Sequence, residues 1–200
     1  MTPRFGIPPD DQALADAITR FAQAELAPHA HAEDEAALST VRYVPALAEL
    51  GVMGMNLPER WGGPGATPTA LVLSLAAIAQ ACTATASMIG AHYLATYSLL
   101  LGGDDALRER YLPDAASGAK LGAFALTDPR AGSNPADMAT RAAREGDHYH
   151  LSGTKHFISN AGEADFIVVY AKTDPAAGHR GISAFVMDKG TPGLRISAPE

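Results

Sequence analysis

The sequence predicts an α+β protein in two parts, an all-α N-terminal domain over residues 1–120 and a β domain of short strands over residues 121–200. Three observations predict this division. In the first part, apolar side chains recur every three or four positions, which is the period of an amphipathic helix. In the second part, short apolar runs alternate with turns, a pattern typical of an antiparallel barrel or sandwich. The period changes at Ala-Ser-Gly-Ala, residues 116–119, and we expect the domain boundary there.

The N-terminal helices have recognisable start and stop signals. A first helix is expected to begin at Pro8-Pro9-Asp10, with one apolar face formed by Leu14, Ile18, Phe21 and Ala22. Pro45 can occupy the first turn of a short helix that ends at Leu50-Gly51, where the glycine supplies the C-terminal cap.

Two longer helices and a short one follow. Thr67-Pro68 predicts a helix start, and its expected buried stripe is Leu71, Leu75, Ile78, Ala79 and Cys82. The stripe of the next helix is expected at Ile89, Tyr93, Thr96, Tyr97 and Leu100, before Gly102-Gly103 ends it. Asp104 predicts the cap of a last short helix that reaches Pro113.

Six strands are expected in the second part, over residues 121–126, 139–144, 148–151, 155–159, 165–172 and 181–187. Glu145-Gly146-Asp147 predicts a tight hairpin connection, and residues 175–178 predict a looser one.

Composition narrows the class of protein. The chain has 200 residues, of which 47% are hydrophobic and 18% charged, so it can form a folded core. A formal net charge of −7 disfavours nucleic acid and anionic membranes as partners. Cys82 is the only cysteine, so no intrachain disulfide can form, and its apolar helical setting favours a buried packing thiol. With no export signal and no apolar run long enough to span a membrane, we expect a cytoplasmic protein.

Several common sites lack support in the sequence. No GxGxxG motif follows a strand and opens a helix, and there is no GxxxxGK[ST] or GxSxG motif. His148 and His150 share one strand face, but no third ligand lies at a suitable spacing, so no metal site is expected. His92 is expected to be a core or interface histidine. The acidic run is expected to be a solvated helix face and comprises Glu25, Glu33, Asp34 and Glu35.

Polar residues gather after two of the expected strands. FALTDPRAGS, residues 124–133, runs from an apolar strand into a turn, and GTKHFISNAG, residues 153–162, ends a second strand in the same way. Hydroxyls and exposed backbone N–H groups at strand ends can bind anions or the polar edge of a planar ring, although each piece alone is also ordinary turn chemistry. Two such edges could hold one flat cofactor between them.

The order and spacing of these segments resemble the flavin-binding middle domain of the acyl-CoA dehydrogenases. The resemblance extends upstream through GVMGMNLPERWGGPG (residues 51–65) and ERYLPDAASGAKLGAFALTDP (residues 109–129). Downstream it continues through HRGISAFVMDKGTPGLRIS, residues 179–197, so that nearly all of the chain is covered. It implies an α+β multidomain fold, in which an N-terminal all-α helical domain is followed by an antiparallel β-barrel domain that is incomplete at residue 200.

The resemblance also implies FAD as cofactor and roles for particular residues. The segment that includes Phe124, Ala125, Leu126, Thr127, Gly132 and Ser133 would bind FAD, with Thr127 on the polar edge of the flavin. Ser133 would lie near the FAD pyrophosphate and the thioester of the substrate. Phe157, Ile158 and Ser159 would lie against the isoalloxazine, with the Ser159 hydroxyl directed at flavin N5, where a donor tunes the cofactor.

Three positions depart from the commoner family residues. Asp128 replaces a glutamate, Ser159 replaces a threonine, and Arg130 replaces a glycine. Arg130 could disturb a tight turn or could bind a phosphate of CoA or FAD, so it is a candidate substrate-binding residue together with Ser133.

The implied reaction is FAD-dependent α,β-dehydrogenation of an acyl-CoA thioester, as in fatty acid β-oxidation: a proton leaves Cα, hydride passes from Cβ to flavin N5, and an electron-transfer flavoprotein or similar acceptor is reduced. The family's catalytic glutamate lies in a C-terminal helical bundle beyond residue 200, so no catalytic residue is expected within this chain, which we expect to be inactive alone. A full-length form is expected to be a homodimer or homotetramer. The alternatives are a related flavin oxidase or monooxygenase, or a non-catalytic truncated remnant.

Overall fold

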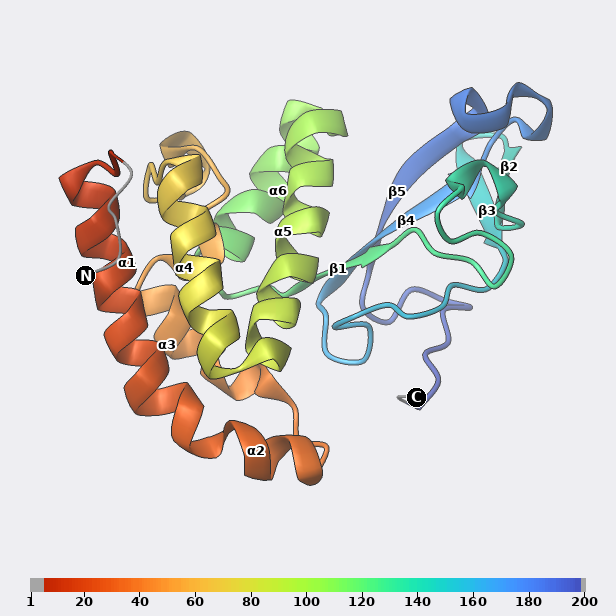
Figure 1. Ribbon diagram of the computed structural model, residues 1–200. Coiled ribbons are helices and arrows are strands. Elements are labelled where there is room, and N and C mark those ends of the chain that lie inside the picture. Colours follow the sequence, from red (N-terminus) through yellow and green to blue (C-terminus); the bar gives the residue numbers. More distant parts are fainter. Residues whose placement is uncertain (1–5, 199–200) are drawn as a thin grey trace.

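The computed structural model describes residues 6–198, which form a helical region and a β region joined at strand β1 (Figure 1). Residues 1–5 and 199–200, at the outer ends of the two expected domains, lie outside the described residues. The helices are α1 (Pro9–Phe21), α2 (Ala27–Glu35), α3 (Val44–Glu49), α4 (Pro68–Ala81), α5 (Thr83–Gly102) and α6 (Asp105–Ala116). A π-helical segment, Ala22–Leu26, joins α1 to α2.

The expected helix boundaries are confirmed where a capping residue marks them. The Thr67 hydroxyl accepts a hydrogen bond from the backbone N–H of Ala70 at the start of α4, and Asp104 does the same for Leu107 at the start of α6. Gly51 follows α3 with a φ of 72°, a left-handed conformation that glycine adopts without steric cost.

Three expectations about helix faces need correction. Tyr97, expected in the buried stripe of α5, is 40% exposed, because it lines a hollow instead of the core. The buried line of α4 is Ala70, Ser74 and Ile78, whereas Leu71 and Leu75 are only half-buried, because the small side chains let α4 pack closely against α1. Glu33 is buried rather than solvated, since its Oε1 accepts a hydrogen bond from the Tyr43 hydroxyl at 2.8 Å and pairs with Arg42.

The strands are β1 (Gly122–Ala125), β2 (Arg141–Glu145), β3 (His148–Ser152), β4 (Phe166–Lys172) and β5 (Ile182–Asp188). Strand β4 pairs with β5 in antiparallel fashion, and its other edge pairs in parallel with β1 and, at Lys172, with β2. The β2–β3 hairpin turns at Gly146, as expected.

The prediction of an antiparallel barrel is therefore wrong in its details. The sheet is mixed, because β1 and β4 run parallel with a long excursion between them. It is also not closed, because its end strands do not pair with one another. Residues 155–159, expected as a strand, are irregular: Phe157 and, just after, Asn160 have φ values of 56° and 67°, which no strand accommodates. The general order, helical region first and sheet region second, is confirmed.

The hydrophobic core continues across the junction of the two regions. Phe166 and Val168 of β4 pack against α5 and α6 in a cluster with Leu99 and Leu112. Gly122 allows this close approach, because a Cβ there would lie 2.7 Å from the Phe166 ring and 2.9 Å from Ala95. Tyr111 and Arg110 of α6 both bind the Asp188 carboxylate at the end of β5, at 2.7 and 2.5 Å. The β region is thus docked firmly on α5 and α6.

Candidate functional site at two adjoining strand ends

The two segments singled out in the sequence lie side by side. Residues 126–127, which continue β1, receive two hydrogen bonds from residues 155–156: Lys155 Nζ donates to the Leu126 carbonyl at 2.8 Å, and the His156 N–H donates to the Thr127 carbonyl at 2.9 Å. The fold therefore brings together two segments that are distant in the chain, since Leu126 and Lys155 are 29 positions apart.

The first segment passes from the core to the surface. Ala125 is buried, Phe124 packs its ring against Tyr170, and Leu126 and Thr127 are half-buried. A short turn closed by mutual backbone hydrogen bonds between Asp128 and Ala131 follows. Arg130 is exposed within this turn, and Gly132 and Ser133 are exposed just after it.

The second segment presents an aromatic ring to solvent. Phe157 is 77% exposed and holds a left-handed backbone, which costs a bulky residue about 1 kcal/mol or more. Ile158 packs against the core beneath the sheet, and Ser159 is exposed. The Asn160 side chain fixes the end of the segment, since its Nδ2 donates to the carbonyls of Met88 on α5 and Gly122 on β1.

A buried ionic network lies directly beneath both segments. The Asp128 carboxylate, 3% exposed, accepts hydrogen bonds from the N–H groups of Ala139 and Thr140, from the Thr140 hydroxyl and from Lys155 Nζ at 2.6 Å. Sequence reasoning treated Asp128 as a turn residue and passed over Lys155. The only sequence signal that could have indicated a contact between Asp128 and Lys155 is that each lies in one of the two strand-end motifs.

The surroundings favour the ionised carboxylate of Asp128. Burial alone raises the pKa of Asp128, but hydrogen bonds from Lys155 and Thr140, together with the charge of the lysine, hold this pKa below its usual value. Burial lowers the pKa of Lys155, and Asp128 opposes that effect only in part.

The free polar groups of the site suit a flat ring with polar edges. Within residues 6–198, no side-chain hydrogen bond engages the hydroxyls of Thr127, Ser133 or Ser159, so all three can bind a ligand. The exposed Phe157 ring, two residues before Ser159, adds an apolar surface in the second segment. Arg130 is exposed and pairs with no carboxylate of the described residues, so its charge is also available. This donor set fits the polar edge and phosphates of a flavin nucleotide.

His92 connects α5 to the start of β1. Its Nδ1 accepts a hydrogen bond from the Gly122 N–H at 3.0 Å, which requires Nδ1 to be unprotonated. Burial lowers the pKa of His92 to about 4, so the ring is neutral at physiological pH. The expectation of a core or interface histidine is confirmed, and so is that of a buried thiol at Cys82.

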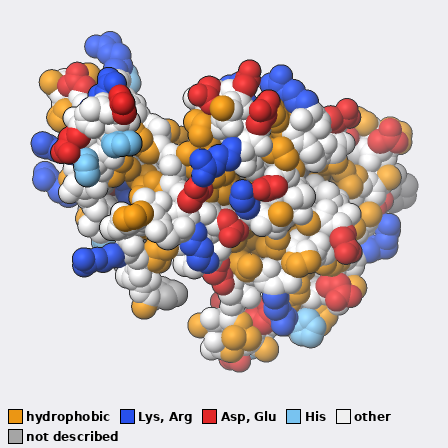
Figure 2. Space-filling model, turned by 180° about the vertical axis from the view of Figure 1, so that it is seen from behind, with side chains coloured by type: hydrophobic (Ala, Val, Ile, Leu, Met, Phe, Trp, Pro, Cys, Tyr) orange, Lys and Arg blue, Asp and Glu red, His pale blue; other side chains and the backbone are white. Residues whose placement is uncertain are grey.

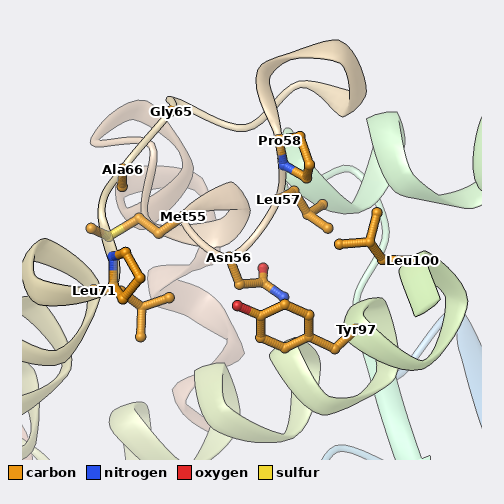
Figure 3. A pocket seen from close by; sticks show the side chains of 10 residues that line it. Met55, Asn56, Leu57, Pro58, Gly65, Ala66, Leu71, Tyr97 and Leu100 are labelled. Atoms are coloured by element: carbon orange, nitrogen blue, oxygen red, sulfur yellow. The ribbon is translucent and has the colours of Figure 1, made fainter.

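Two hollows lie elsewhere, in the helical region. One pocket of about 280 Å³ lies between the loop after α3 and the helices α4 and α5, and Figure 3 shows Asn56 and Tyr97 in it beneath Met55 and Leu57. A second, of about 290 Å³, is lined by Ala30, His31 and residues of the α4–α5 connection. None of the sequence-predicted site residues lines either pocket.

Two further properties of residues 6–198 bear on function. No group of three His, Cys, Asp or Glu side chains in this part of the chain could hold a metal, and the exposed His150 instead pairs with Glu145 at 3.2 Å. No helix among them is both long and apolar enough to cross a membrane. The face in Figure 2 intersperses Lys and Arg with Asp and Glu.

Sequence comparisons match two adjoining domain families. The acyl-CoA dehydrogenase N-terminal domain matches residues 8–119, and the acyl-CoA dehydrogenase middle domain matches residues 123–200. A cyclohex-1-ene-1-carbonyl-CoA dehydrogenase of Geobacter metallireducens is 42% identical over 92% of this chain and 49% of its own length. A mitochondrial isovaleryl-CoA dehydrogenase of Pongo abelii is 38% identical over 96% of this chain and 47% of its own. The chain spans about half the length of the curated relatives it matches.

Solved structures show the same relationship. A chain from a study of the electron transferring flavoprotein of Acidaminococcus fermentans superposes with a TM-score of 0.93 at 33% identity, over 99% of this chain and 52% of that one. A glutaryl-CoA dehydrogenase of Mycobacterium smegmatis in complex with FADH2 gives 0.87 at 30% identity, over 94% and 47%. The prolyl acyl carrier protein oxidase AnaB gives 0.85 at 28% identity, over 97% and 52%.

Proposed function

Because this chain belongs to the acyl-CoA dehydrogenase family, we propose that it carries the helical and flavin-binding parts of an FAD-dependent enzyme that dehydrogenates an acyl-CoA thioester between Cα and Cβ. The observation that carries this proposal is the pairing of residues 126–127 with residues 155–156, which brings the two segments predicted to bind flavin side by side. When bound, FAD supplies the two-electron acceptor for the reaction.

The residues of the site divide into two proposed roles. Backbone groups of Phe124, Ala125, Leu126 and Gly132, with the Thr127 hydroxyl, bind the polar edge of FAD, while Phe157, Ile158 and Ser159 cover the ring. The Ser159 hydroxyl would donate a hydrogen bond towards N5, the atom that receives the hydride, and would thereby raise the electron affinity of the ring. Ser133 and Arg130 lie on the side of the phosphates and of the acyl-CoA substrate.

We assign the general base to no residue of this chain. The two aspartates next to the site segments are already engaged, because Asp128 is in the buried network and Asp165 accepts a hydrogen bond from the Leu121 N–H at 2.8 Å. A positioned base contributes roughly 10²–10⁴-fold to such a proton transfer. We therefore expect the 200-residue chain alone to bind FAD weakly, to be prone to aggregate, and not to dehydrogenate acyl-CoAs.

The test is to purify the chain, titrate it with FAD, and follow flavin bleaching anaerobically with acyl-CoAs of several chain lengths. We expect FAD binding without bleaching. Bleaching at an enzymatic rate would show that a base lies within residues 1–200, and an absence of FAD binding would contradict the proposed function and favour the reading of a non-catalytic remnant.

A related flavin oxidase is the second candidate, favoured by the likeness to AnaB. In the complete enzyme, peroxide formation in air would indicate an oxidase, whereas anaerobic reduction of an electron-transfer flavoprotein would indicate a dehydrogenase. The superposition with a chain from an electron transferring flavoprotein study supports such a partner.

The setting of the enzyme is also a proposal. We propose a cytoplasmic homodimer or homotetramer that acts in fatty acid β-oxidation, with a domain boundary at residues 120–121. Sedimentation of the complete protein measures the assembly, and limited proteolysis near residues 117–121 tests the boundary.

A further inference from the structure

Lys155 makes two different contacts from one buried position. Its side chain is 11% exposed and that of Asp128 is 1% exposed, so their 2.6 Å ion pair is shielded from water. The same Nζ also donates to the Leu126 carbonyl at 2.8 Å. One ammonium group therefore joins the backbone of the first segment to a carboxylate that is itself held by Ala139 and Thr140 at the entrance to β2.

A gain in folding stability does not explain why this ion pair is buried. Removing two charges from water costs several kcal/mol per ion, and their attraction repays that cost only when the remaining hydrogen-bonding positions are satisfied. Here the contacts are directional, because four donor groups meet one carboxylate and the lysine reaches a particular carbonyl. Such a network specifies the geometry of the groups around it more than it adds to the free energy of folding.

The geometry that it specifies is that of the candidate flavin site. Leu126 and Thr127 end the first segment, and Lys155 and His156 lead directly into the strained, exposed Phe157. The second segment forms no strand ladder with β1. Its spacing from the first segment is therefore set by the lysine contact, by the backbone bond from His156 to Thr127 and, at its far end, by the bond from Asn160 to the Gly122 carbonyl.

We propose that Lys155, held in place by Asp128, is a positioning residue of the flavin site, which sets the distance between the Thr127 edge and the segment of residues 157–159. The inference rests on the proposed function, since it names the device that shapes the proposed FAD site. Lys155 does not touch the cofactor in this account. It acts through the Leu126 carbonyl and through its own backbone.

The experiment compares Lys155→Met, Asp128→Asn and the double variant, with FAD itself as the probe. Each single variant leaves one buried charge without its partner, so we expect both to lose stability. The double variant removes both charges, so its stability is expected to recover towards that of the parent chain. Its FAD affinity is expected to stay about tenfold weaker, because the Leu126 carbonyl still lacks its donor. The visible spectrum of the bound flavin should shift as well.

A purely structural role makes the opposite prediction, namely that FAD affinity recovers together with stability in the double variant. That result would overturn the inference. Asp128→Glu and Lys155→Arg keep both charges and serve as fold-preserving variants, in which a moved ammonium or guanidinium should alter the flavin spectrum while the midpoint of unfolding stays close to that of the parent. Unchanged spectra and affinities in both would also overturn it.

The matched control is the half-exposed pair formed by Lys120 and Asp114, whose nitrogen and oxygen lie 2.8 Å apart. Lys120→Met with Asp114→Asn removes the same two charges away from the site, and it should leave FAD affinity within twofold of the parent, as expected for a surface ion pair of about 0–1 kcal/mol. If the parent chain itself binds no FAD, the proposed function falls and this inference falls with it. If the parent binds FAD and the double variant binds it equally well, only the inference falls.

Discussion

The helical region and the strand-end site hold their buried groups by different means. In the helical region, fully buried side chains such as Ile18, Leu47 and Ile78 form a continuous apolar core. At the site, the buried groups are a carboxylate, an ammonium and a hydroxyl, and the backbone nearby is strained at Phe157. Apolar packing supplies stability without strong directionality, whereas a hydrogen-bonded ionic network fixes positions at little net gain. The difference predicts that stability and cofactor binding can be perturbed separately.

The largest expected effect on stability comes from the apolar core. Ile78→Ala removes a fully buried side chain from α4 and should lower the free energy of unfolding by about 2–5 kcal/mol, because it deletes apolar contacts and leaves a cavity. Urea denaturation measures this loss. The control is Val72→Ala on the same helix, which is 63% exposed and should change stability by less than about 0.5 kcal/mol.

Measuring FAD binding to Ile78→Ala tests whether the apolar core and the strand-end site are independent. At a temperature where Ile78→Ala is still folded, its FAD affinity should equal that of the parent chain, because α4 makes no contribution to the site. A tenfold loss of affinity in the folded variant would show that the core and the site are coupled, and the distinction between the two regions would be wrong.

The second prediction concerns His92, the polar group at the junction of the two regions. Its folded pKa, about 4, lies below the unfolded value of 6.5, so the unfolded state binds the proton more tightly between these pH values. Its contribution to stability is therefore fully present above pH 6.5 and is lost as the pH falls towards 4, by up to about 1.4 kcal/mol per pH unit. Asp128 contributes a loss of stability only at lower pH, below its usual pKa of 3.8, because its pKa in the folded protein is lowered.

Denaturation at several pH values checks this window. His92→Asn keeps an acceptor for the Gly122 N–H and removes the titrating group, so the slope of stability against pH between 4 and 6.5 should become flatter. His29→Asn, at an exposed position, should leave the slope as it is. An unchanged slope in His92→Asn would mean that other groups cause the acid sensitivity.

Sequence reasoning succeeded where local signals determine structure and failed where distant contacts decide. Thr67 and Asp104 cap helices because their side chains bond to backbone groups three residues away, a relation visible in the sequence. Residues 155–159 contain Phe157 and Ile158, an aromatic and a β-branched residue of the kind enriched in strands, yet the hydrogen bonds of this segment go to Leu126 and Thr127 and the backbone at Phe157 is left-handed. The parallel pairing of β1 with β4 and the Asp128–Lys155 contact likewise join positions that no local pattern relates.

The two motifs were singled out from the sequence by their order and spacing, which resemble those of the acyl-CoA dehydrogenases, because hydroxyls and glycine after a strand are by themselves also ordinary turn chemistry. The sequence did not indicate the buried ion pair of Asp128 and Lys155 that joins the two segments. A buried aspartate in a TDP turn looks the same in sequence as an exposed one, and the burial of Glu33 was missed for the same reason. Burial depends on the packing of the whole fold, which a single sequence states only indirectly.

The third prediction sharpens the comparison from the side of the site. Thr127→Val and Ser159→Ala each remove one free hydroxyl and should each weaken FAD binding by about 0.5–1.5 kcal/mol, while the free energy of unfolding without FAD stays nearly constant. Ser197→Ala, an exposed serine elsewhere, is the control. FAD fluorescence quenching measures affinity, and an unchanged affinity and flavin spectrum in the double variant would rule out flavin contact at these two positions.

The smallest expected effect is that of substituting Arg130. Its side chain is exposed, so the attraction between its charge and a bound anion is partly screened by solvent and salt. Arg130→Gln should weaken binding of FAD, or raise the KM for acyl-CoA in the complete enzyme, by about two- to threefold at low ionic strength. At high salt the difference should vanish, because the Debye length falls to about 3 Å at 1 M. Arg144→Gln, on the β2–β3 hairpin, also removes an exposed charge but lies outside the site, so it controls for the change in net charge. If the two substitutions weaken binding equally at low salt, the effect belongs to the overall charge of −7 and Arg130 has no phosphate of its own to bind. If only Arg130→Gln weakens binding, and if high salt abolishes this difference, then a phosphate of the ligand binds beside the turn formed by residues 128–131.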